Sequence, residues 1–305
     1  MAKGKLIVLE GIDGSGKSAQ YRRLCARFDE MGMAYHHIVF PRYDQESSAL
    51  IRMYLNGAFG AHPSDVNAYA ASTFFAVDRY ASYRTDWGEI YENGGLILSD
   101  RYTTSNAIHQ GSKLPEAELP AFFDWLYDLE YGKMGLPRPD LVLYLDVDLP
   151  TSLKRMQHRQ EKQNTKADIH EQDVSYLENC LRIGRLAAAH YGWTIVPFMK
   201  DGAERALEEK HEEIFSIIRK LHEQGTTIIV VTHDALVASC AQREIMLNHG
   251  VLVGEKWNDE DARKAYEAAG GKPASTGAQV EGAQNGETAI GFTDPTKAAK
   301  TGGEE

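Results

Sequence analysis

The residues with the clearest chemistry are GIDGSGKS, positions 11–18, which match the pattern Gly-x-x-x-x-Gly-Lys-Ser/Thr of phosphate-binding loops. The loop follows an apolar run of strand length and opens a stretch with helical spacing. Its glycines let backbone amides face phosphate oxygens, and the positive end of the helix adds to the attraction. Lys17 would reach the β and γ phosphates, and Ser18 would ligate magnesium. The other loop residues expected at a bound triphosphate are Gly11, Gly14, Ser15 and Gly16.

Asp13 lies inside the same loop, which is unusual because a carboxylate repels phosphate. We therefore expect Asp13 to receive a hydroxyl group or to orient a second substrate rather than to touch the triphosphate.

A second cluster is LILSDRYTTSNAIHQG, residues 96–111, in which Asp100 and Arg101 follow an apolar strand. Parallel α/β sheets bind ligands at the carboxyl ends of their strands. Asp100 could hold a magnesium-bound water, and Arg101 could bridge phosphate oxygens with its planar fork. A surface ion pair is the alternative, and the position after the third predicted strand favours the ligand role.

Two further stretches fit a phosphate acceptor. FPRYD, residues 40–44, puts Arg42 at the end of a predicted strand, and STFFAVDRYASYR, residues 72–84, puts Phe75 and Arg79 one helical turn apart. An aromatic ring beside an arginine can stack on a base and donate to its edge. Core packing is the alternative for Phe75.

The elements that must position these residues are predicted from apolar periodicity. Runs of strand length at 5–10, 35–40, 95–100, 140–147 and 192–198 alternate with longer helical stretches. This alternation predicts an α/β fold with a five-stranded parallel sheet and helices on both faces. A helix over 203–221 would close a first domain, residues 1–221.

The motifs EGIDGSGKSAQ, FPRYD, FFAVDRY and DRYTTSNAIHQG occur in this order within about residues 4–221. In order and approximate spacing they resemble the thymidylate kinase family. The resemblance implies a P-loop NTPase fold and a Mg²⁺-dependent kinase that transfers the γ-phosphoryl group of ATP to dTMP, giving dTDP in dTTP biosynthesis. It also implies a homodimer.

The resemblance implies a role for each motif residue. Lys17 and Ser18 would bind ATP and magnesium, and Asp13 would contact the sugar 3′-hydroxyl of dTMP. The remaining acceptor residues would be Arg42 and Arg101 on the phosphate, Phe75 stacked on thymine, Arg79 and Asn106 at the base edge, and Gln110 near the nucleoside. His109 stands where most members carry Tyr or Phe near the sugar, which leaves discrimination against ribonucleotides open.

Basic residues gather in SLKRMQHRQEKQNTKADIHEQD, residues 152–173, where Arg155, Arg159 and Lys162 have helical spacing. Taken alone, this spacing predicts a basic helix face exposed to solvent. The resemblance instead implies a mobile lid that supplies the catalytic arginine, because the loop carries Gly14 where some members carry arginine. We expect Arg159 to close over the transferring phosphate and Arg155 to bind ATP.

The expected reaction needs positioning and charge neutralisation, since the acceptor oxygen is already an anion. The alternatives are a deoxynucleoside kinase, which would need a carboxylate base and would lack Arg42, another nucleoside monophosphate kinase, or a non-catalytic ATP-binding regulator. A comparison of thymidine with dTMP as acceptor separates the first of these.

Residues 222–254 resemble the last strand, switch histidine and hairpin of ABC-type ATPase domains, with His233 as the histidine. The Leu-Ser-Gly-Gly-Gln signature and the Asp-Glu strand end that such a histidine serves do not occur between residues 18 and 233. We therefore expect 222–267 to be a structural strand, helix and hairpin packed on the kinase sheet. Residues 268–305, rich in Gly, Ala, Thr and Glu, are predicted to be disordered.

Composition narrows the partners. The 305 residues carry a net charge of −11, which argues against a general nucleic-acid or anionic-membrane binder. Three separated cysteines and the absence of a long apolar run near the start predict a cytoplasmic protein.

Overall fold

The computed structural model describes residues 3–163, 169–171, 173–223, 229–232, 243–248, 251–268 and 288–291. The chain divides into two compact units: Met1–Arg23 with Tyr35–Ile214, and Leu24–Ala34 with Phe215–Glu305. None of the helices in these described ranges is long and apolar enough to cross a bilayer.

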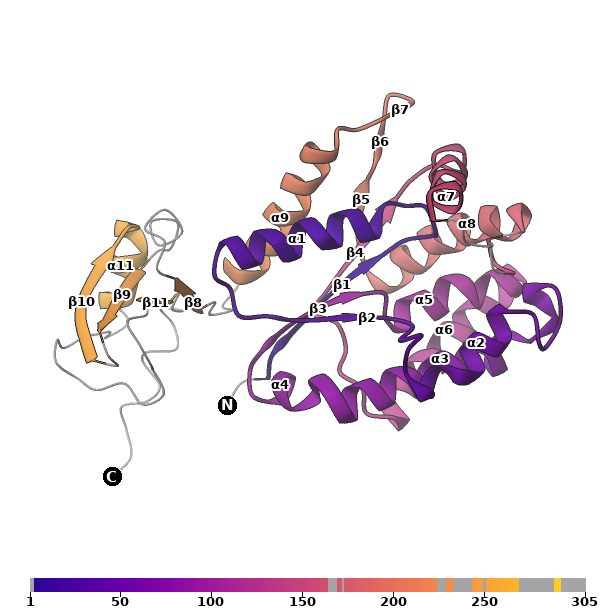
Figure 1. Cartoon of the computed structure of the whole chain (residues 1–305), viewed down its shortest axis with the longest axis horizontal. Helices are drawn as coiled ribbons and strands as arrows, with labels where there is room; N and C mark the ends of the chain where they lie inside the picture. The colour runs from indigo at the N-terminus through magenta and orange to yellow at the C-terminus, as the bar shows by residue number, and fades with distance from the viewer. Residues whose placement is uncertain are drawn as a thin grey trace. The chain divides into compact units, whose positions relative to one another are not determined.

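The first unit is built on a five-stranded sheet (Figure 1). Its strands are β1 (Lys5–Glu10), β2 (His36–Val39), β3 (Leu96–Asp100), β4 (Leu141–Asp146) and β5 (Thr194–Pro197), in the order β2-β3-β1-β4-β5. Every neighbouring pair is parallel. The central strands are buried on both faces, which explains their continuous apolar sequences and confirms the predicted sheet.

Helices flank this sheet on both sides (Figure 1). In chain order they are α1 (Lys17–Glu30), α2 (Ala49–Leu55), α3 (Ala68–Ser82), α4 (Gly88–Glu92), α5 (Thr103–His109), α6 (Leu119–Tyr127), α7 (Leu149–Gln163), α8 (Val174–Tyr191) and α9 (Leu207–Glu223). Local sequence fixes the ends of α8: the Asp173 side chain accepts from Tyr176 N at 2.9 Å, and Gly192 ends the helix at φ 70°.

The predicted helix over 203–221 is wrong at its start. Ala203–Glu204 is a strand, β7, that pairs with β6 (Met199–Lys200), and α9 begins only at Leu207. Glu204 is drawn into this hairpin because its carboxylate bonds both Lys210 and Arg155.

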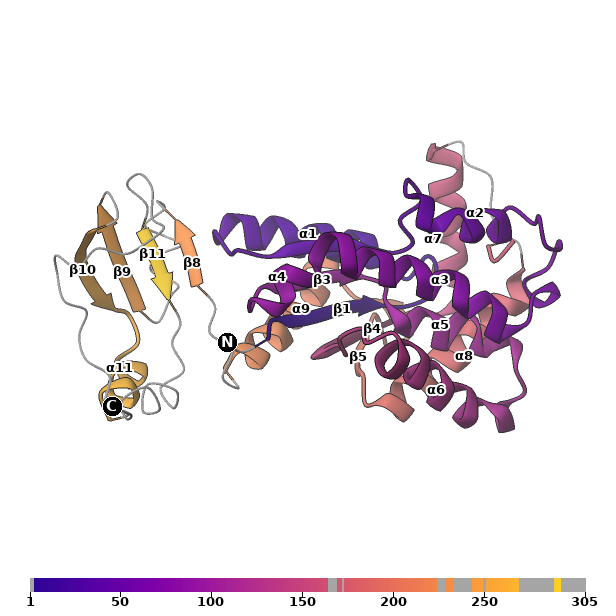
Figure 2. The same ribbon diagram turned by 90° about the horizontal axis from the view of Figure 1, so that it is seen from below.

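The second unit contains a four-stranded sheet (Figure 2). Its strands are β8 (Ile229–Thr232), β9 (Arg243–Asn248), β10 (Val251–Trp257) and β11 (Thr288–Gly291), in the order β10-β9-β11-β8, and helix α11 (Glu260–Ala268) follows β10. The predicted strand and the β9–β10 hairpin are present, but they pair within a sheet of their own.

The structure describes two pieces of residues 268–305, the segment predicted to be disordered. Ala268 ends α11, and β11 pairs antiparallel with β8 and β9. Strand pairing satisfies backbone groups whatever the composition around them, so a Gly- and Ala-rich stretch can still supply a short strand. The rest of that segment and His233 lie outside the described residues.

Candidate active site

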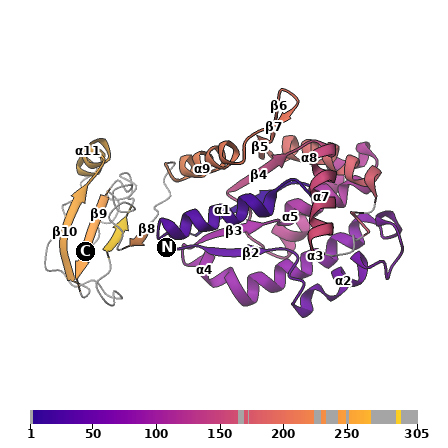
Figure 3. The same cartoon turned by 45° about the horizontal axis from the view of Figure 1, so that its top comes forward.

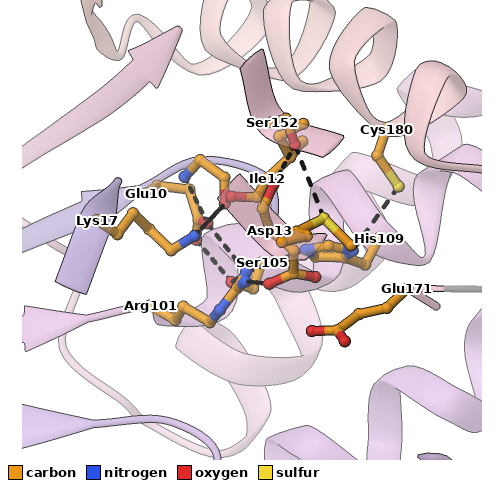
Figure 4. Close-up of polar contacts among 12 residues, drawn as sticks. Glu10, Ile12, Asp13, Lys17, Arg101, Ser105, His109, Ser152, Glu171 and Cys180 are labelled. Carbon is orange, nitrogen blue, oxygen red and sulfur yellow. Dashed lines mark hydrogen bonds and ion pairs between the residues drawn. The ribbon is translucent and has the colours of Figure 1, made fainter. Parts of the chain in front are cut away.

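The phosphate-binding loop connects β1 to α1, as predicted. Lys17 Nζ donates to the carbonyl oxygens of Gly11 at 2.6 Å and Ile12 at 2.9 Å, inside the loop (Figure 4). Burial, and then the charge of Arg101, lower the pKa of Lys17 to about 8. The lysine is thus held at the centre of the loop, where a phosphate oxygen would replace its carbonyl partners.

Arg101 connects the loop to β3 and α5. Its guanidinium is ion-paired with Asp13, lies 3.6 Å from Glu10 Oε1 and donates to His109 Nε2 at 3.0 Å (Figure 4). Burial would raise the pKa of Asp13, but the Arg101 charge holds it below its usual range. The backbone of Arg101 has φ 69°, a strained conformation for a side chain of this size, and is fixed by a bond from its N to Leu9 O at 3.0 Å.

One cavity, which we call the acceptor cavity, lies beside α3 and α5. Its lining brings together most of the acceptor residues predicted from sequence, and with them the predicted lid arginine Arg159: Asp13, Phe75, Arg79, Arg101, Asn106, His109 and Gln110. Both side-chain amide atoms of Gln110 are buried without a hydrogen-bond partner in the described part of the chain. Buried amides are normally satisfied, so Gln110 needs a ligand or a water here.

A second cavity, the donor cavity, lies over the phosphate-binding loop. Among the predicted residues its lining includes Gly14, Ser15, Gly16, Lys17, Ser18, Asp100, Arg101, Arg155 and Arg159. The two cavities share Asp13, Phe40, Pro41, Tyr43, Arg101 and Arg159. A group bound in one cavity is therefore next to a group bound in the other.

The predicted loop residue Gly11 lines neither of these two cavities, and among the predicted acceptor residues neither does Arg42. It follows the lining residues Phe40 and Pro41, but its Nε lies 3.3 Å from Asp78 Oδ1 and its backbone N donates to Asp78 Oδ2 at 2.9 Å. The fully buried Asp78 carboxylate holds Arg42 by both groups. A role at the substrate phosphate would require the Arg42 side chain to turn.

Phe75 lies between the apolar core and the acceptor cavity. It packs on the buried cluster of α2 and α3, with its ring edge-on to Tyr54 at 6.4 Å, and it also lines the acceptor cavity.

Helix α7 begins beside the phosphate-binding loop (Figure 3). Ser152 Oγ donates to Asp13 O at 2.5 Å, and Arg155 Nη1 donates to the carbonyl oxygens of Gly14 and Ser15. A Cβ atom on Gly14, which has φ 71°, would collide with the Ser152 carbonyl oxygen. The start of α7 therefore occupies the space that a side chain at position 14 would need.

Arg155 and Arg159 differ in their surroundings. Arg155 is tied to the loop carbonyls and ion-paired with Glu204, whereas Arg159 is ion-paired with Glu171 and 43% exposed. Arg159 lines both cavities and Arg155 only the donor cavity. Residues 164–168 of the basic stretch lie outside the described residues.

The oxygen donors near the loop fit magnesium. Ser18 and Asp100 line the donor cavity together, and burial raises the pKa of Asp100. Within the described residues there is no cluster of three or more His, Cys, Asp or Glu side chains suited to a metal. A hydroxyl and one carboxylate suit a small cation that keeps waters and takes phosphate oxygens as further ligands.

Two histidines form one wall of the acceptor cavity. His109 and His170 stack at 5.6 Å with an interplanar angle of 11°, and His170 Nε2 lies 2.8 Å from Tyr54 Oη. Because an arginine can only donate, the Arg101 bond makes His109 Nε2 an acceptor and the ring neutral. Burial lowers the pKa of both rings.

This burial predicts a loss of stability in acid. The pKa of His170 falls from an ordinary 6.5 to about 3, chiefly through burial, so between these values the unfolded chain binds a proton that the folded chain does not. The contribution of the neutral, buried His170 to the free energy of unfolding is fully present above pH 6.5. It is lost as the pH falls toward 3, at up to about 1.4 kcal/mol per pH unit. We expect His170→Gln to flatten the pH dependence of the unfolding free energy, measured in urea, between pH 6.5 and 4. Identical slopes for variant and wild type would contradict it.

Sequence reasoning missed the buried acids behind the motif residues. Glu10 accepts from Gly11 N, Thr104 Oγ1 and Ser105 Oγ, and Glu130 accepts from Arg79. It also missed His170 and Glu171, which lie within the predicted lid. The signal that was present is a lone acid inside an apolar run, as in KLIVLE for Glu10.

Comparisons with known proteins agree with this geometry. Residues 9–214 match the family model of thymidylate kinase. The chain is 31% identical over 196 residues to a thymidylate kinase of Mycobacterium tuberculosis, covering 63% of this chain and 90% of that protein. The corresponding values for human thymidylate kinase are 28% over 214 residues, 70% and 88%.

A solved structure of thymidylate kinase from Candida albicans has the same fold, with a TM-score of 0.53 at 22% identity, over 73% of this chain and 95% of that one. The family match spans the phosphate-binding loop, the lining of both cavities and four of the five strands of the sheet, and it begins within β1. The chain therefore belongs to the thymidylate kinase family.

Proposed function

We infer that the two adjoining cavities are the site at which this thymidylate kinase family member transfers a phosphoryl group from ATP to dTMP, giving dTDP. The observation that carries this assignment is the shared lining: Arg101, Asp13 and Arg159 face both cavities. Phosphoryl transfer requires donor and acceptor phosphates to meet in line beside positive charge.

On the donor side, we propose that ATP binds along the phosphate-binding loop. Gly11, Gly14, Ser15 and Gly16 would supply backbone amides, Lys17 would exchange its carbonyl partners for phosphate oxygens, and Arg155 would lie along the nucleotide. Ser18 and Asp100 would hold Mg²⁺, Asp100 through a bound water. When bound, the cation neutralises charge on the β and γ oxygens.

On the acceptor side, we propose the following contacts for dTMP: Asp13 with the sugar 3′-hydroxyl, Arg42 and Arg101 with the phosphate, Phe75 stacked on the base, Arg79 and Asn106 at the base edge, Gln110 near the nucleoside, and His109 beside the sugar. The buried unpaired amide of Gln110 supports its place in this set. The Arg101 ion pair with Asp13 would yield to the phosphate when the substrate enters.

In this proposal the side chains of the protein bind and orient the two substrates and form no covalent bond with them. The 5′-phosphate of dTMP is an anion, so no residue has to remove a proton from it. Arg101 would hold the acceptor and Arg159 would neutralise charge on the group in transit. Closure of a lid formed by 152–173 would exclude water and suppress ATP hydrolysis.

Steady-state assays with Mg²⁺–ATP against dTMP, dUMP, dCMP, ribo-TMP and thymidine test this assignment. We expect dTMP to have the highest kcat/KM and thymidine to give no product above background. Efficient phosphorylation of thymidine would favour a deoxynucleoside kinase, and ATP binding without transfer to any acceptor would favour a regulator.

We also propose that the chain forms a homodimer through α2 and α3. These adjacent helices expose five large apolar side chains: Leu50, Met53, Tyr69, Val77 and Tyr80. Exposed apolar side chains that gather on neighbouring helices are typical of a protein interface. Sedimentation equilibrium should give a dimer for the wild type and for Ile195→Glu, which alters an exposed residue of β5, and a monomer for Val77→Glu. A dimeric Val77→Glu variant would place the interface elsewhere.

For the rest of the chain we propose a kinase domain over residues 1–221, with 222–267 as an ABC ATPase-like structural extension in which His233 has no part in the kinase reaction. A cytoplasmic location is proposed on the family membership and on the buried thiol of Cys180.

A further inference from the structure

A fully buried carboxylate lies behind the base-reading residues. Glu130 belongs to the π-helical turn Asp128–Lys133 that follows α6, and its exposed fraction is 0%. Its Oε2 accepts from Arg79 Nε at 2.6 Å and from Thr103 Oγ1 at 2.8 Å. Its Oε1 accepts from Arg79 Nη2 at 2.5 Å and from Asn106 Nδ2 at 3.3 Å. One buried acid thus binds both residues that face the base edge.

The bidentate ion pair with Glu130 determines which hydrogen-bonding groups Arg79 can present to the acceptor cavity. Its Nε and Nη2 atoms are directed at Glu130, so Nη1 is the nitrogen of the fork outside the pair. A guanidinium carries donors and no acceptor. Arg79 lines the acceptor cavity and therefore presents an N–H donor to it. Burial opposes its charge, but Glu130 outweighs burial and raises the pKa of Arg79.

The same carboxylate determines how the Asn106 amide is turned. Asn106 Nδ2 donates to Ser72 O at 3.0 Å and to Glu130 Oε1 at 3.3 Å. Both neighbours can only accept, so the amide nitrogen must face them and the carbonyl oxygen Oδ1 must face away. Asn106 also lines the acceptor cavity, to which it presents an acceptor.

We propose that Glu130 is a positioning residue that sets the donor–acceptor order of the base-reading wall, and thereby selects a pyrimidine-2,4-dione over a 4-aminopyrimidine. A 2,4-dione presents a C4 oxygen that accepts beside an N3–H that donates, which complements Arg79 and Asn106. A 4-aminopyrimidine presents an amino donor beside an N3 acceptor, which is the reverse order. If a 4-aminopyrimidine bound, its amino donor would face the Arg79 donor and its N3 acceptor would face the Asn106 acceptor, so these buried groups would be left without hydrogen bonds.

This inference rests on the proposed function, because it assumes that the acceptor cavity takes a nucleoside monophosphate. It makes a prediction specific to Glu130→Gln. The new amide would direct an N–H donor at Asn106 and leave one oxygen for Arg79. Asn106 would then turn its oxygen toward position 130 and its nitrogen into the cavity, which weakens the match to thymine and relieves the clash with cytosine.

The experiment compares kcat and KM for dTMP, dCMP and ATP in wild type, Glu130→Gln, Glu130→Asp and the control Thr103→Val. For Glu130→Gln we expect the KM for dTMP to rise and the ratio of kcat/KM for dTMP over dCMP to fall, each by about 10- to 100-fold, as for one or two mispaired buried groups. The KM for ATP should stay within about twofold, since the donor cavity is untouched.

The other variants separate positioning from stability. Thr103→Val removes one bond to Glu130 and leaves Arg79 and Asn106 in place, so it should keep the dTMP/dCMP ratio. Glu130→Asp keeps the negative charge but shortens the side chain by one methylene. It should therefore raise the KM for dTMP while keeping the dTMP/dCMP ratio of kcat/KM above that of Glu130→Gln.

Removing one partner of a buried ion pair can unfold a protein. If Glu130→Gln does not fold, Glu130→Asp and the apolar pair Arg79→Met/Glu130→Met carry the same measurements.

A double-mutant cycle with Arg79→Ala completes the test. If Glu130 acts through Arg79 and Asn106, adding Glu130→Gln to Arg79→Ala should cost much less in dTMP kcat/KM than adding it to wild type. Additive losses, or folded Glu130 variants with an unchanged dTMP KM and an unchanged ratio, would overturn the inference. A wild-type protein inactive on dTMP would instead refute the proposed function.

Discussion

Replacing Arg101 with alanine is expected to lower kcat by roughly 10³- to 10⁵-fold, the range for loss of an arginine at a transferring phosphoryl group. Arg101 lines both cavities and pairs with Asp13, so its removal would take a cation from the place where the proposed donor and acceptor phosphates meet. It also removes a positive charge that interacts with Asp13, Glu10 and Asp100, so these carboxylates would repel the substrate phosphate more strongly.

Arg101→Lys separates charge from geometry. Lysine keeps the positive charge but lacks the planar fork that reaches Asp13 and His109 together. We expect it to recover part of the loss in kcat but not the wild-type rate. Melting curves recorded in parallel show whether each variant is folded at the assay temperature. A folded Arg101→Ala variant with kcat within tenfold of wild type would remove Arg101 from the mechanism.

Arg159→Ala is expected to lower kcat by roughly 10²- to 10³-fold, as for loss of one preorganised donor at developing charge. The KM for dTMP should change little, because Arg159 would act on the group in transit. Stability should also change little, since its ion pair with Glu171 lies near the surface and such pairs contribute little.

Arg182→Ala is the matched control for this variant. Arg182 is 49% exposed, pairs with Glu116 from a helix surface, and lines neither the donor nor the acceptor cavity. It should keep wild-type kcat and a similar melting temperature. If Arg159→Ala also turned over within a few-fold of wild type, the lid arginine would have to be sought elsewhere.

The sheet and the phosphate-binding loop could be predicted because their signals are local. The central strands β1, β3 and β4 are each built on a run of apolar residues, and the loop residues lie within a few positions of one another. Such local signals do not reveal which strands pair when they lie far apart in the sequence. β11 joins β8 across more than fifty residues, so its own composition says little about it.

The same limit applies within the site. Motif residues such as Asp13 and Arg101 could be named from spacing, but not that they pair with each other across 88 positions. Glu130 is 51 positions from Arg79, and nothing in its own neighbourhood distinguishes it from a surface acid. Arg42 was expected at a phosphate, whereas its contact with Asp78 depends on how α3 packs.

The close approach of α7 to Gly14 limits how this kinase could evolve. A mutation that introduced arginine at position 14 would force the Ser152 turn away from the loop before the new side chain could help catalysis. The role proposed for Arg159 in the lid could therefore pass to an arginine in the loop only if both segments were remodelled together.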